Sequence, residues 1–465
     1  MKRSLLALAL AFVCVSPALA QTGEKLSFGR FGTITLYRTS PRPAHVVLFV
    51  SGDGGWNLGV VDMARELAAQ DTLVVGVDIR TYLQSLATSS EKCSYPAADF
   101  EALSKFVQKK LEYTRYVPPV LVGYSSGATL VYATLVQAPP PTFRGAMSLG
   151  FCPDLLLTKP MCRGSGLEAN PGPKGKGYTF RPATALEVPW VAFQGTIDQV
   201  CNPLATEAYV KQVKNGDIVV LPKVGHGFSV PRNWLPQFKQ SFAKLVAPRP
   251  EDAPVRPAEV SDLPLEEVPA EKPGGDLLVV HITGDGGWGV TDRGLARMLA
   301  AEGIPVVGLN SLQYFWSQKT PEQTAADLGR IMRHYLAAWN KQRVILIGYS
   351  FGADVLPFLV NHLPKELQAR VQLITLLGPS HYADFEFHLT DWLGATRRST
   401  SLAVLPEIEK LRGMRILCFY GEDEEDTLGP ELASSGLATV VKLEGGHRVG
   451  RNFEPIAREI LEAVR

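Results

Sequence analysis

Two stretches of the chain share one pattern: VLVGYSSGATLVYATL at residues 120–135 and ILIGYSFGADVLPFLV at residues 345–360. In each, a short apolar run of strand composition ends in Gly-Tyr-Ser-X-Gly, and a longer apolar run of helical length follows. G-x-S-x-G between a strand and a helix is typical of the nucleophile elbow, a sharp turn that lifts a serine hydroxyl clear of the backbone. Ser125 and Ser350 are therefore the candidate nucleophiles.

The rest of the chain repeats in the same order around the two elbows. SGDGGW at residues 51–56 corresponds to TGDGGW at residues 283–288, and LPKVGHGF at residues 221–228 corresponds to LEGGHRVG at residues 443–450. The repeat is far longer than those of solenoid proteins, so it indicates duplication of a whole domain. A length of 465 residues also favours two domains.

Within each copy, short apolar runs alternate with helical stretches. Continuous apolar strands between helices predict an α/β fold: two tandem α/β-hydrolase domains, each a mainly parallel sheet flanked by helices. The expected strands are residues 46–50, 73–77, 120–122, 190–193 and 218–221 in the first copy, and residues 277–282, 306–309, 344–347, 373–377 and 416–419 in the second. Residues 60–69 and 100–111 are expected helices.

The two ends of the first domain are marked by composition. Residues 1–20 have a basic start, an apolar run too short to span a bilayer, and an Ala-Leu-Ala cleavage site, which together predict a signal peptide. Residues 247–275 are rich in proline and acidic residues and predict a linker. We therefore expect an N-terminal domain at residues 21–246 and a C-terminal domain at residues 276–465, in a periplasmic protein without a transmembrane segment.

The charge balance argues against nucleic acid as a partner. The chain has 47 Lys and Arg against 46 Asp and Glu, a formal net charge of +1. Nucleic-acid binding usually needs a basic surplus or a basic stripe.

The cysteines suit an exported protein. Cys93, Cys152, Cys162 and Cys201 lie in the first copy and allow two disulfides in three pairings. We favour Cys152–Cys162 with Cys93–Cys201, because the first would close a short loop. Cys418 lies in a strand-like run and is expected to be a buried free thiol. A zinc site is the alternative, but no C-x-x-C spacing supports it, so we expect no metal site. We also expect no cofactor.

An acid and a histidine follow the first serine in the chain order of α/β-hydrolases. Asp198 follows a strand, and His226 follows the next strand. Serine is a poor nucleophile at neutral pH, so the histidine takes its proton and the acid fixes the histidine tautomer. The alternative is a degenerate elbow with a structural serine, which we consider more seriously for Ser125 than for Ser350, because duplicated enzymes often keep one working site.

In the second copy His447 is the expected histidine, but the acid is ambiguous. GEDEEDT at residues 421–427 offers several carboxylates. Counting three places from the glycine, as in the first copy, selects Glu424, with Asp426 as the alternative.

The GDGGW turns follow the strand at which this fold supplies an oxyanion donor. The aspartate in the turn is unexpected, because a carboxylate facing an oxyanion opposes catalysis. Two roles stay open: it caps the following helix, which we favour, or Asp285 holds a cationic group of the substrate. The residues assigned to the two oxyanion holes are Ser126, Asp53 and Gly54 in the first copy and Phe351, Asp285 and Gly286 in the second.

The second copy resembles the AcvB/VirJ family of exported bacterial proteins. The strings that carry this are TGDGGW (283–288), PVVGLNSLQYFW (305–316), GYSFGADVLPF (348–358), FEFHLTDWLG (385–394) and EGGH (444–447). The first copy resembles the N-terminal module of the longer AcvB form, mainly through its fold. The resemblance implies hydrolysis of aminoacyl-phosphatidylglycerol, notably the lysyl or alanyl form, at the membrane surface, with Ser350 as nucleophile and His447 as base.

A cationic lipid ester as substrate selects further candidate residues. Ammonium partners are sought among Asp285, Asp354, Asp384, Glu386 and Asp391, and an apolar lipid rim among Tyr314, Phe315, Trp316, Phe385, Phe387 and Trp392. Asp285, Tyr314, Trp316, Asp384 and Trp392 are the favoured substrate-binding residues. The basic segment 158–182 of the first copy is a candidate for contact with an anionic membrane surface.

Two other functions remain open. One is a different periplasmic carboxylesterase, because an elbow does not identify a substrate. The other is a non-enzymatic protein, associated with virulence and secretion, that binds exported proteins. Two complete sets of triad residues argue against the second.

Overall fold

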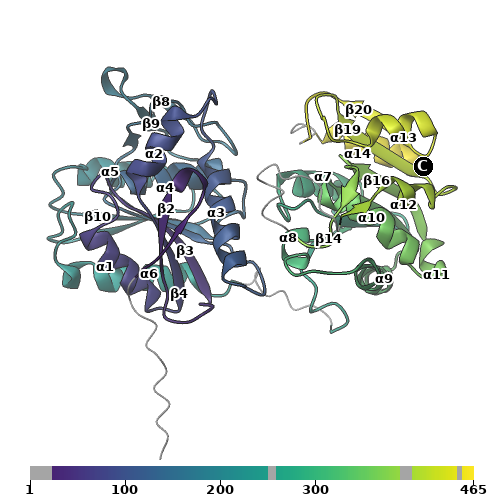
Figure 1. The fold of residues 1–465 in the computed structure, drawn as a ribbon, viewed down its shortest axis with the longest axis horizontal. Coiled ribbons are helices and arrows are strands. Elements are labelled where there is room, and N and C mark those ends of the chain that lie inside the picture. Colours follow the sequence, from purple (N-terminus) through teal and green to yellow (C-terminus); the bar gives the residue numbers. More distant parts are fainter. Residues whose placement is uncertain (1–22, 250–257, 388–400, 448–452) are drawn as a thin grey trace, which may run out of the picture.

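The computed structural model describes residues 23–249, 258–387, 401–447 and 453–465. Two units, each built around one sheet, lie side by side (Figure 1). The expected signal peptide, residues 1–20, falls outside the described residues. No helix among the described residues is both long enough and apolar enough to cross a membrane.

The first sheet has eight strands in the order β1-β2-β4-β3-β5-β6-β10-β11. All neighbours from β4 to β11 are parallel, and only the β1–β2 and β2–β4 pairs are antiparallel. The strands are β1 (Glu24–Ser27), β2 (Thr33–Tyr37), β3 (His45–Val50), β4 (Thr72–Val77), β5 (Val120–Tyr124), β6 (Gly145–Leu149), β10 (Trp190–Gly195) and β11 (Gly216–Leu221).

Helices cover both faces of this sheet. One apolar core joins it to α2 (Ile79–Thr88), α3 (Pro96–Lys110), α4 (Ser126–Gln137) and α5 (Pro203–Val210), and a second joins it to α1 (Leu58–Ala68) and α6 (Leu235–Val246). Burial on both faces explains why the strands read as continuous apolar runs.

The second sheet has seven strands in the order β12-β14-β13-β15-β16-β19-β20, all parallel except β12. They are β12 (Leu265–Val268), β13 (Leu277–Ile282), β14 (Val306–Leu309), β15 (Arg343–Tyr349), β16 (Val371–Leu377), β19 (Ile416–Gly421) and β20 (Thr439–Leu443). One face packs on α9 (Pro321–Ala338), α10 (Phe351–His362), α11 (Lys365–Gln368), α12 (Leu405–Glu409) and α13 (Gly429–Ser435), and the other on α7 (Val290–Ala301) and α14 (Glu454–Val464). The predicted tandem α/β architecture and its strands are confirmed.

The predicted linker is too long. Of residues 247–275, Leu265–Val268 form β12, an edge strand antiparallel to β14. Val260 and Leu263 are buried in the core of the second domain. These apolar side chains, spaced among prolines and acids, find partners only in the folded domain, which therefore begins inside the predicted linker.

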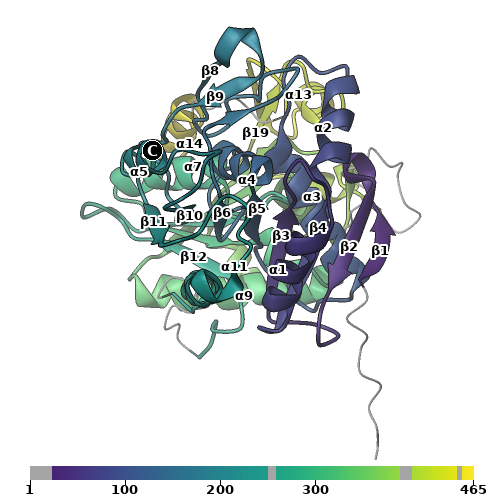
Figure 2. The same ribbon diagram turned by 90° about the vertical axis from the view of Figure 1, so that its left-hand side faces the viewer.

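The basic segment 158–182 is folded rather than an open loop. It contains β8 (Ala169–Pro171) and β9 (Tyr178–Phe180), which form a small sheet with the preceding β7 (Asp154–Leu155) at the same end of the domain as α2 (Figures 1 and 2). Arg163 and Arg181 both pair with Glu168. These two charges are therefore partly neutralised within the segment.

All four predicted cysteines form disulfides, but the favoured pairing is wrong. The bonds are Cys93–Cys162 and Cys152–Cys201. Cys152 and Cys201 follow β6 and β10, which are neighbours in the sheet, so their loops leave the same edge. A β-bridge between Ser94 and Met161 brings the other two together. Cys418 is free and buried, as predicted.

Candidate active sites

The backbone at both candidate serines has the strained conformation of an elbow. Ser125 has φ 54° and ψ −123°, and Ser350 has φ 51° and ψ −118°. A positive φ is uncommon for residues other than glycine and persists where the surroundings enforce it. The neighbouring glycines are required: a Cβ at Gly123 would lie 2.1 Å from the carbonyl oxygen of Gly127, and one at Gly348 would lie 2.4 Å from that of Gly352.

The first site is a connected triad. Nε2 of His226 lies 2.9 Å from Oγ of Ser125, and Nδ1 lies 2.9 Å from Oδ2 of Asp198. The other oxygen of Asp198, which is buried, accepts hydrogen bonds from the backbone amides of Val200 at 2.8 Å and Cys201 at 2.9 Å. These amides hold the carboxylate in place.

The second site has the same connections. Oγ of Ser350 lies 2.7 Å from Nε2 of His447, and Nδ1 of His447 is bonded to Glu424. The hydrogen bond to Glu424 raises the pKa of His447 despite the burial that opposes it, and the charges of Glu424, Asp354 and Asp285 raise it further. Glu424 also accepts from the amide of Gly421 at 3.2 Å. Counting from that glycine therefore selected the acid that the structure brings to the histidine.

Asp426, the alternative acid, is not part of the triad. Its Oδ1 lies 2.7 Å from Nδ1 of His381, and the other nitrogen of His381 lies 3.2 Å from Glu431. The two carboxylates raise the pKa of His381, with Asp426 the larger cause. His381 carries no motif in the sequence, which is why it was missed.

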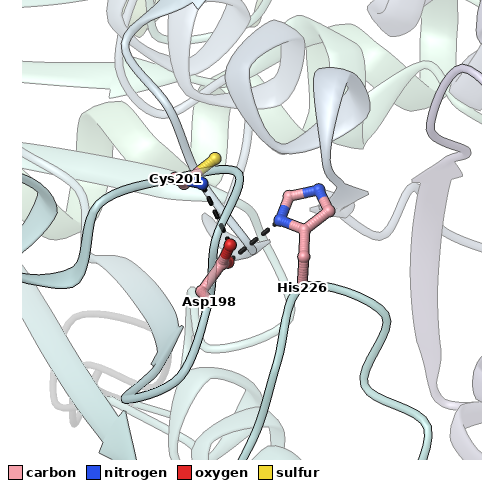
Figure 3. A group of neighbouring side chains, drawn as sticks. All are labelled: Asp198, Cys201 and His226. Carbon is pink, nitrogen blue, oxygen red and sulfur yellow. Dashed lines mark hydrogen bonds and ion pairs between the residues drawn. The ribbon is translucent and has the colours of Figure 1, made fainter.

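Asp198, Cys201 and His226 form a group with metal-ligand spacing, since their ligand atoms lie within 4.8 Å of one another (Figure 3). The donor set does not suit a metal. The sulfur of Cys201 is bonded to Cys152 and is not a thiolate, and both ring nitrogens of His226 already contact the triad partners. The group is best described as a triad with a disulfide beside its acid.

The GDGGW turns face the serines. In both domains the strand before the turn pairs with the strand before the elbow at the same register, Val50 with Gly123 and Ile282 with Gly348. A Cβ at Gly52 would lie 3.0 Å from Cβ of Ser125, which places the first turn directly against its nucleophile.

The other predicted oxyanion residues lie where expected along the chain. Gly54 and Gly286 have no atoms within 4 Å of an added Cβ and therefore border open space. Ser126 and Phe351 are the first residues of α4 and α10, so their amides point out of the helix N-termini.

The tryptophan of each turn has a role that the sequence did not reveal. A Cβ at Gly76 would lie 2.1 Å from the ring of Trp56, and one at Gly308 would lie 2.2 Å from the ring of Trp288. Each indole therefore packs against a glycine of the neighbouring strand. The contact fixes the GDGGW turn to the sheet.

The favoured capping role of the turn aspartates is wrong. The N-cap residue of α1 is Asn57, and its side chain makes no capping hydrogen bond to the helix. The cap of α7 is Gly289, whose amide donates to Asp292 at 3.0 Å. Asp53 is exposed, whereas Asp285 is half-buried and its charge acts on His447. The second role, an anchor for a cation at Asp285, remains a proposal.

The predicted aromatic rim is wrong for Tyr314 and Trp316. Both are buried, and Tyr314 donates to Asp327 at 2.6 Å. Nε1 of Trp316 donates to the carbonyl of Tyr113 at 2.7 Å, and its ring stacks on Phe387 at 5.7 Å. Tyr314 is buried in the core of its own domain, and Trp316 is buried because it lies at the contact between the two domains. Phe315 and Phe385 are also buried.

The other substrate-binding candidates differ in their contacts and in whether the structure describes them. Asp384 is half-buried and accepts from Oγ of Ser401 at 3.0 Å, and Glu386 pairs with Lys109 of the first domain at 3.1 Å. Trp392 and Asp391 lie outside the described residues. Among the described members of this set of acids, Asp354 and Asp285 have charges that act on the catalytic histidine.

Solved structures similar to this chain include three hydrolases, each covering about half of it. The esterase domain of a Rhodothermus marinus protein is 17% identical, with a TM-score of 0.34 over 48% of this chain and 98% of that one. A putative dienelactone hydrolase from Klebsiella pneumoniae is 14% identical, with a TM-score of 0.36 over 49% and 98%. An α/β serine hydrolase without a lid from Xanthomonas campestris is 19% identical, with a TM-score of 0.33 over 52% and 100%.

No curated protein sequence matches the chain. A family model described as bacterial virulence protein (VirJ) matches residues 44–148 and 276–465. The matched residues make up more than half of the chain and include both GDGGW turns and both elbows. The chain therefore belongs to the VirJ family of bacterial virulence proteins.

Proposed function

We propose that the protein is an exported serine esterase that hydrolyses the aminoacyl ester of aminoacyl-phosphatidylglycerol through Ser350. The observation that carries the proposal is the connected Ser350–His447–Glu424 triad with the half-buried carboxyl of Asp354 one helical turn from the serine. A triad supplies ester cleavage, and an acidic surrounding suits an ester that carries an ammonium group. The motif strings of the second domain support the lipid as substrate.

The chemistry follows from the contacts. His447 takes the proton of Ser350 as Oγ attacks the ester carbonyl, and Glu424 stabilises the imidazolium. The amide of Phe351 and the GDGG turn stabilise the oxyanion. Collapse releases the glycerol hydroxyl of phosphatidylglycerol with the proton from His447. Water, activated by the same histidine, then frees the amino acid and regenerates the serine.

Two features support action outside the cytoplasm. Residues 1–20 have the pattern of a signal peptide. Cys93–Cys162 and Cys152–Cys201 are structural disulfides, which form and persist in oxidising compartments.

The test uses the purified full-length mature chain and vesicles that contain lysyl-phosphatidylglycerol, with release of lysine followed by mass spectrometry. We expect the wild-type protein and Ser125→Ala to release lysine and Ser350→Ala to release about 10³-fold less or lower still. Release by Ser350→Ala at the wild-type rate would overturn the proposal. Cleavage of simple p-nitrophenyl esters without cleavage of the lipid would instead indicate a different carboxylesterase.

A further inference from the structure

One of the differences between the two active sites lies four residues after each serine. Residues four apart on a helix lie on the same face, so this side chain is the neighbour of the nucleophile. The first domain has Thr129 there, and the second has Asp354. The duplicated chain therefore provides an internal comparison of the same site with two chemistries.

Both side chains form a hydrogen bond to the backbone of an equivalent loop, but one donates and the other accepts. Oγ1 of Thr129 donates to the carbonyl of Cys152 at 2.6 Å. Oδ1 of Asp354 accepts from the amide of Ser380 at 2.6 Å. Cys152 and Ser380 occupy equivalent places in the loops that leave β6 and β16. In both sites this hydrogen bond holds the helix to the loop, but only in the second site is the helix residue a carboxylic acid.

Among the residues that the structure describes, no Lys, Arg or His side chain forms an ion pair with the carboxyl of Asp354, although the charge of His447 acts on it. Ser380 holds the carboxyl: its amide donates to Oδ1 at 2.6 Å, and its hydroxyl also favours the charged form. Burial raises the pKa of Asp354 to about 8, because removal of water disfavours the charged form. A half-buried carboxylate is costly without a counter-charge, and an ammonium group of a bound ligand would supply one.

The surroundings of the first serine lack this buried carboxyl. Thr129 is buried and neutral. The guanidinium of Arg80 lies beside the GDGGW turn, where a Cβ at Gly55 would meet it at 2.0 Å, but it is paired with Asp78 at 2.7 Å. Ile197 and Val200, which flank the triad acid in the sequence, are exposed aliphatic side chains. In the second site the corresponding turn glycine, Gly287, packs against the uncharged Asn310.

We propose that this position divides the substrates of the two triads by charge. Asp354 binds the α-ammonium group of an aminoacyl ester in the second site, and Thr129 leaves the first site to uncharged acyl esters. An α-ammonium group is attached to the carbon next to the ester carbonyl, so a carboxyl one turn from the nucleophile is well placed for it. The inference rests on the proposed function in that both triads hydrolyse esters.

The test compares two p-nitrophenyl esters that differ only in the amino group, that of alanine and that of propionate. Asp354→Asn is made in a Ser125→Ala background, so that only the second site contributes to the measured activity. Asparagine keeps an oxygen for the Ser380 amide and removes the charge. The charge of Asp354 also acts on His447, so a change common to both esters is expected. We expect the ratio of kcat/KM for the alanine ester to that for the propionate ester to fall about 10- to 100-fold, the range for a lost hydrogen bond to a charged group.

The reciprocal variant is Thr129→Asp in a Ser350→Ala background, with folding checked by its melting temperature. We expect it to shift the first site toward the alanine ester. Equal losses on both esters in Asp354→Asn, or no loss on either, would overturn the proposal. Failure of the proposed function gives a different result: the Ser350→Ala single variant would then cleave the lipid as the wild-type protein does.

Discussion

Asp426 lies 2.7 Å from His381 and is not bonded to His447, although it is only two residues from the acid that is. We therefore expect Glu424→Gln to lower kcat by about 10³- to 10⁴-fold, because the imidazole loses the partner that fixes its tautomer. Asp426→Asn is the matched control and should keep kcat within about threefold. Both are measured on an ester in the Ser125→Ala background. A larger loss in Asp426→Asn than in Glu424→Gln would reverse the assignment.

The pH dependence of the second site should reflect its acidic surroundings. His447 acts as a base only when neutral, and Glu424, Asp354 and Asp285 raise its pKa. The acidic limb of kcat/KM should therefore lie above about pH 6.5, the ordinary value for histidine. Asp285→Asn removes one of these charges and should move the limb to lower pH. An unchanged limb in the Asp285→Asn profile would show that this carboxylate does not act on the histidine.

Asp354 should make the protein less stable in alkaline solution. Its pKa is raised to about 8 in the folded chain, whereas an unfolded aspartate has a pKa of about 4. The protonated carboxyl therefore contributes its full stability below about pH 4, and this stability is lost as the pH rises through 8. Asp354→Asn cannot ionise, so it should melt higher than the wild-type protein at pH 9. Melting curves at pH 5 and pH 9 would check this. A variant that melts lower at pH 9 contradicts it.

The two disulfides should differ in their effect on catalysis. Cys152–Cys201 ties down the loop whose amide at Cys201 binds Asp198, whereas Cys93–Cys162 lies outside the triad. Removing either pair by alanine should cost about 2–4 kcal/mol of unfolding free energy. Only the Cys152→Ala/Cys201→Ala protein should also lose activity at Ser125, assayed in a Ser350→Ala background. Equal activity in the two double variants would show that the bond does not support the acid.

The parts of the site that could be predicted from the sequence are those set by local geometry. The elbows were recognisable because Gly123 and Gly348 cannot carry a Cβ against the helix that follows. Glu424 was selected by its distance from Gly421, because the turn after the strand sets which side chain faces inward. The strands were predicted because burial on both faces requires continuous apolar runs.

Other features depended on which distant segments meet. Cys152 pairs with Cys201 because β6 and β10 are neighbours in the sheet, an order that no spacing of cysteines encodes. Trp316 is buried because Tyr113 of the other domain accepts its N–H, so an aromatic that looked like a lipid contact is part of an interface.

The sequence by itself determined the duplication, the α/β class and the order of the triad residues, because these follow from local pattern and chain order. The tertiary structure decided the disulfide pairing, the partner of Asp426 and the loop contacts of Thr129 and Asp354. Each of these depends on which loop of a neighbouring strand a side chain faces, and that is set by packing across the sheet.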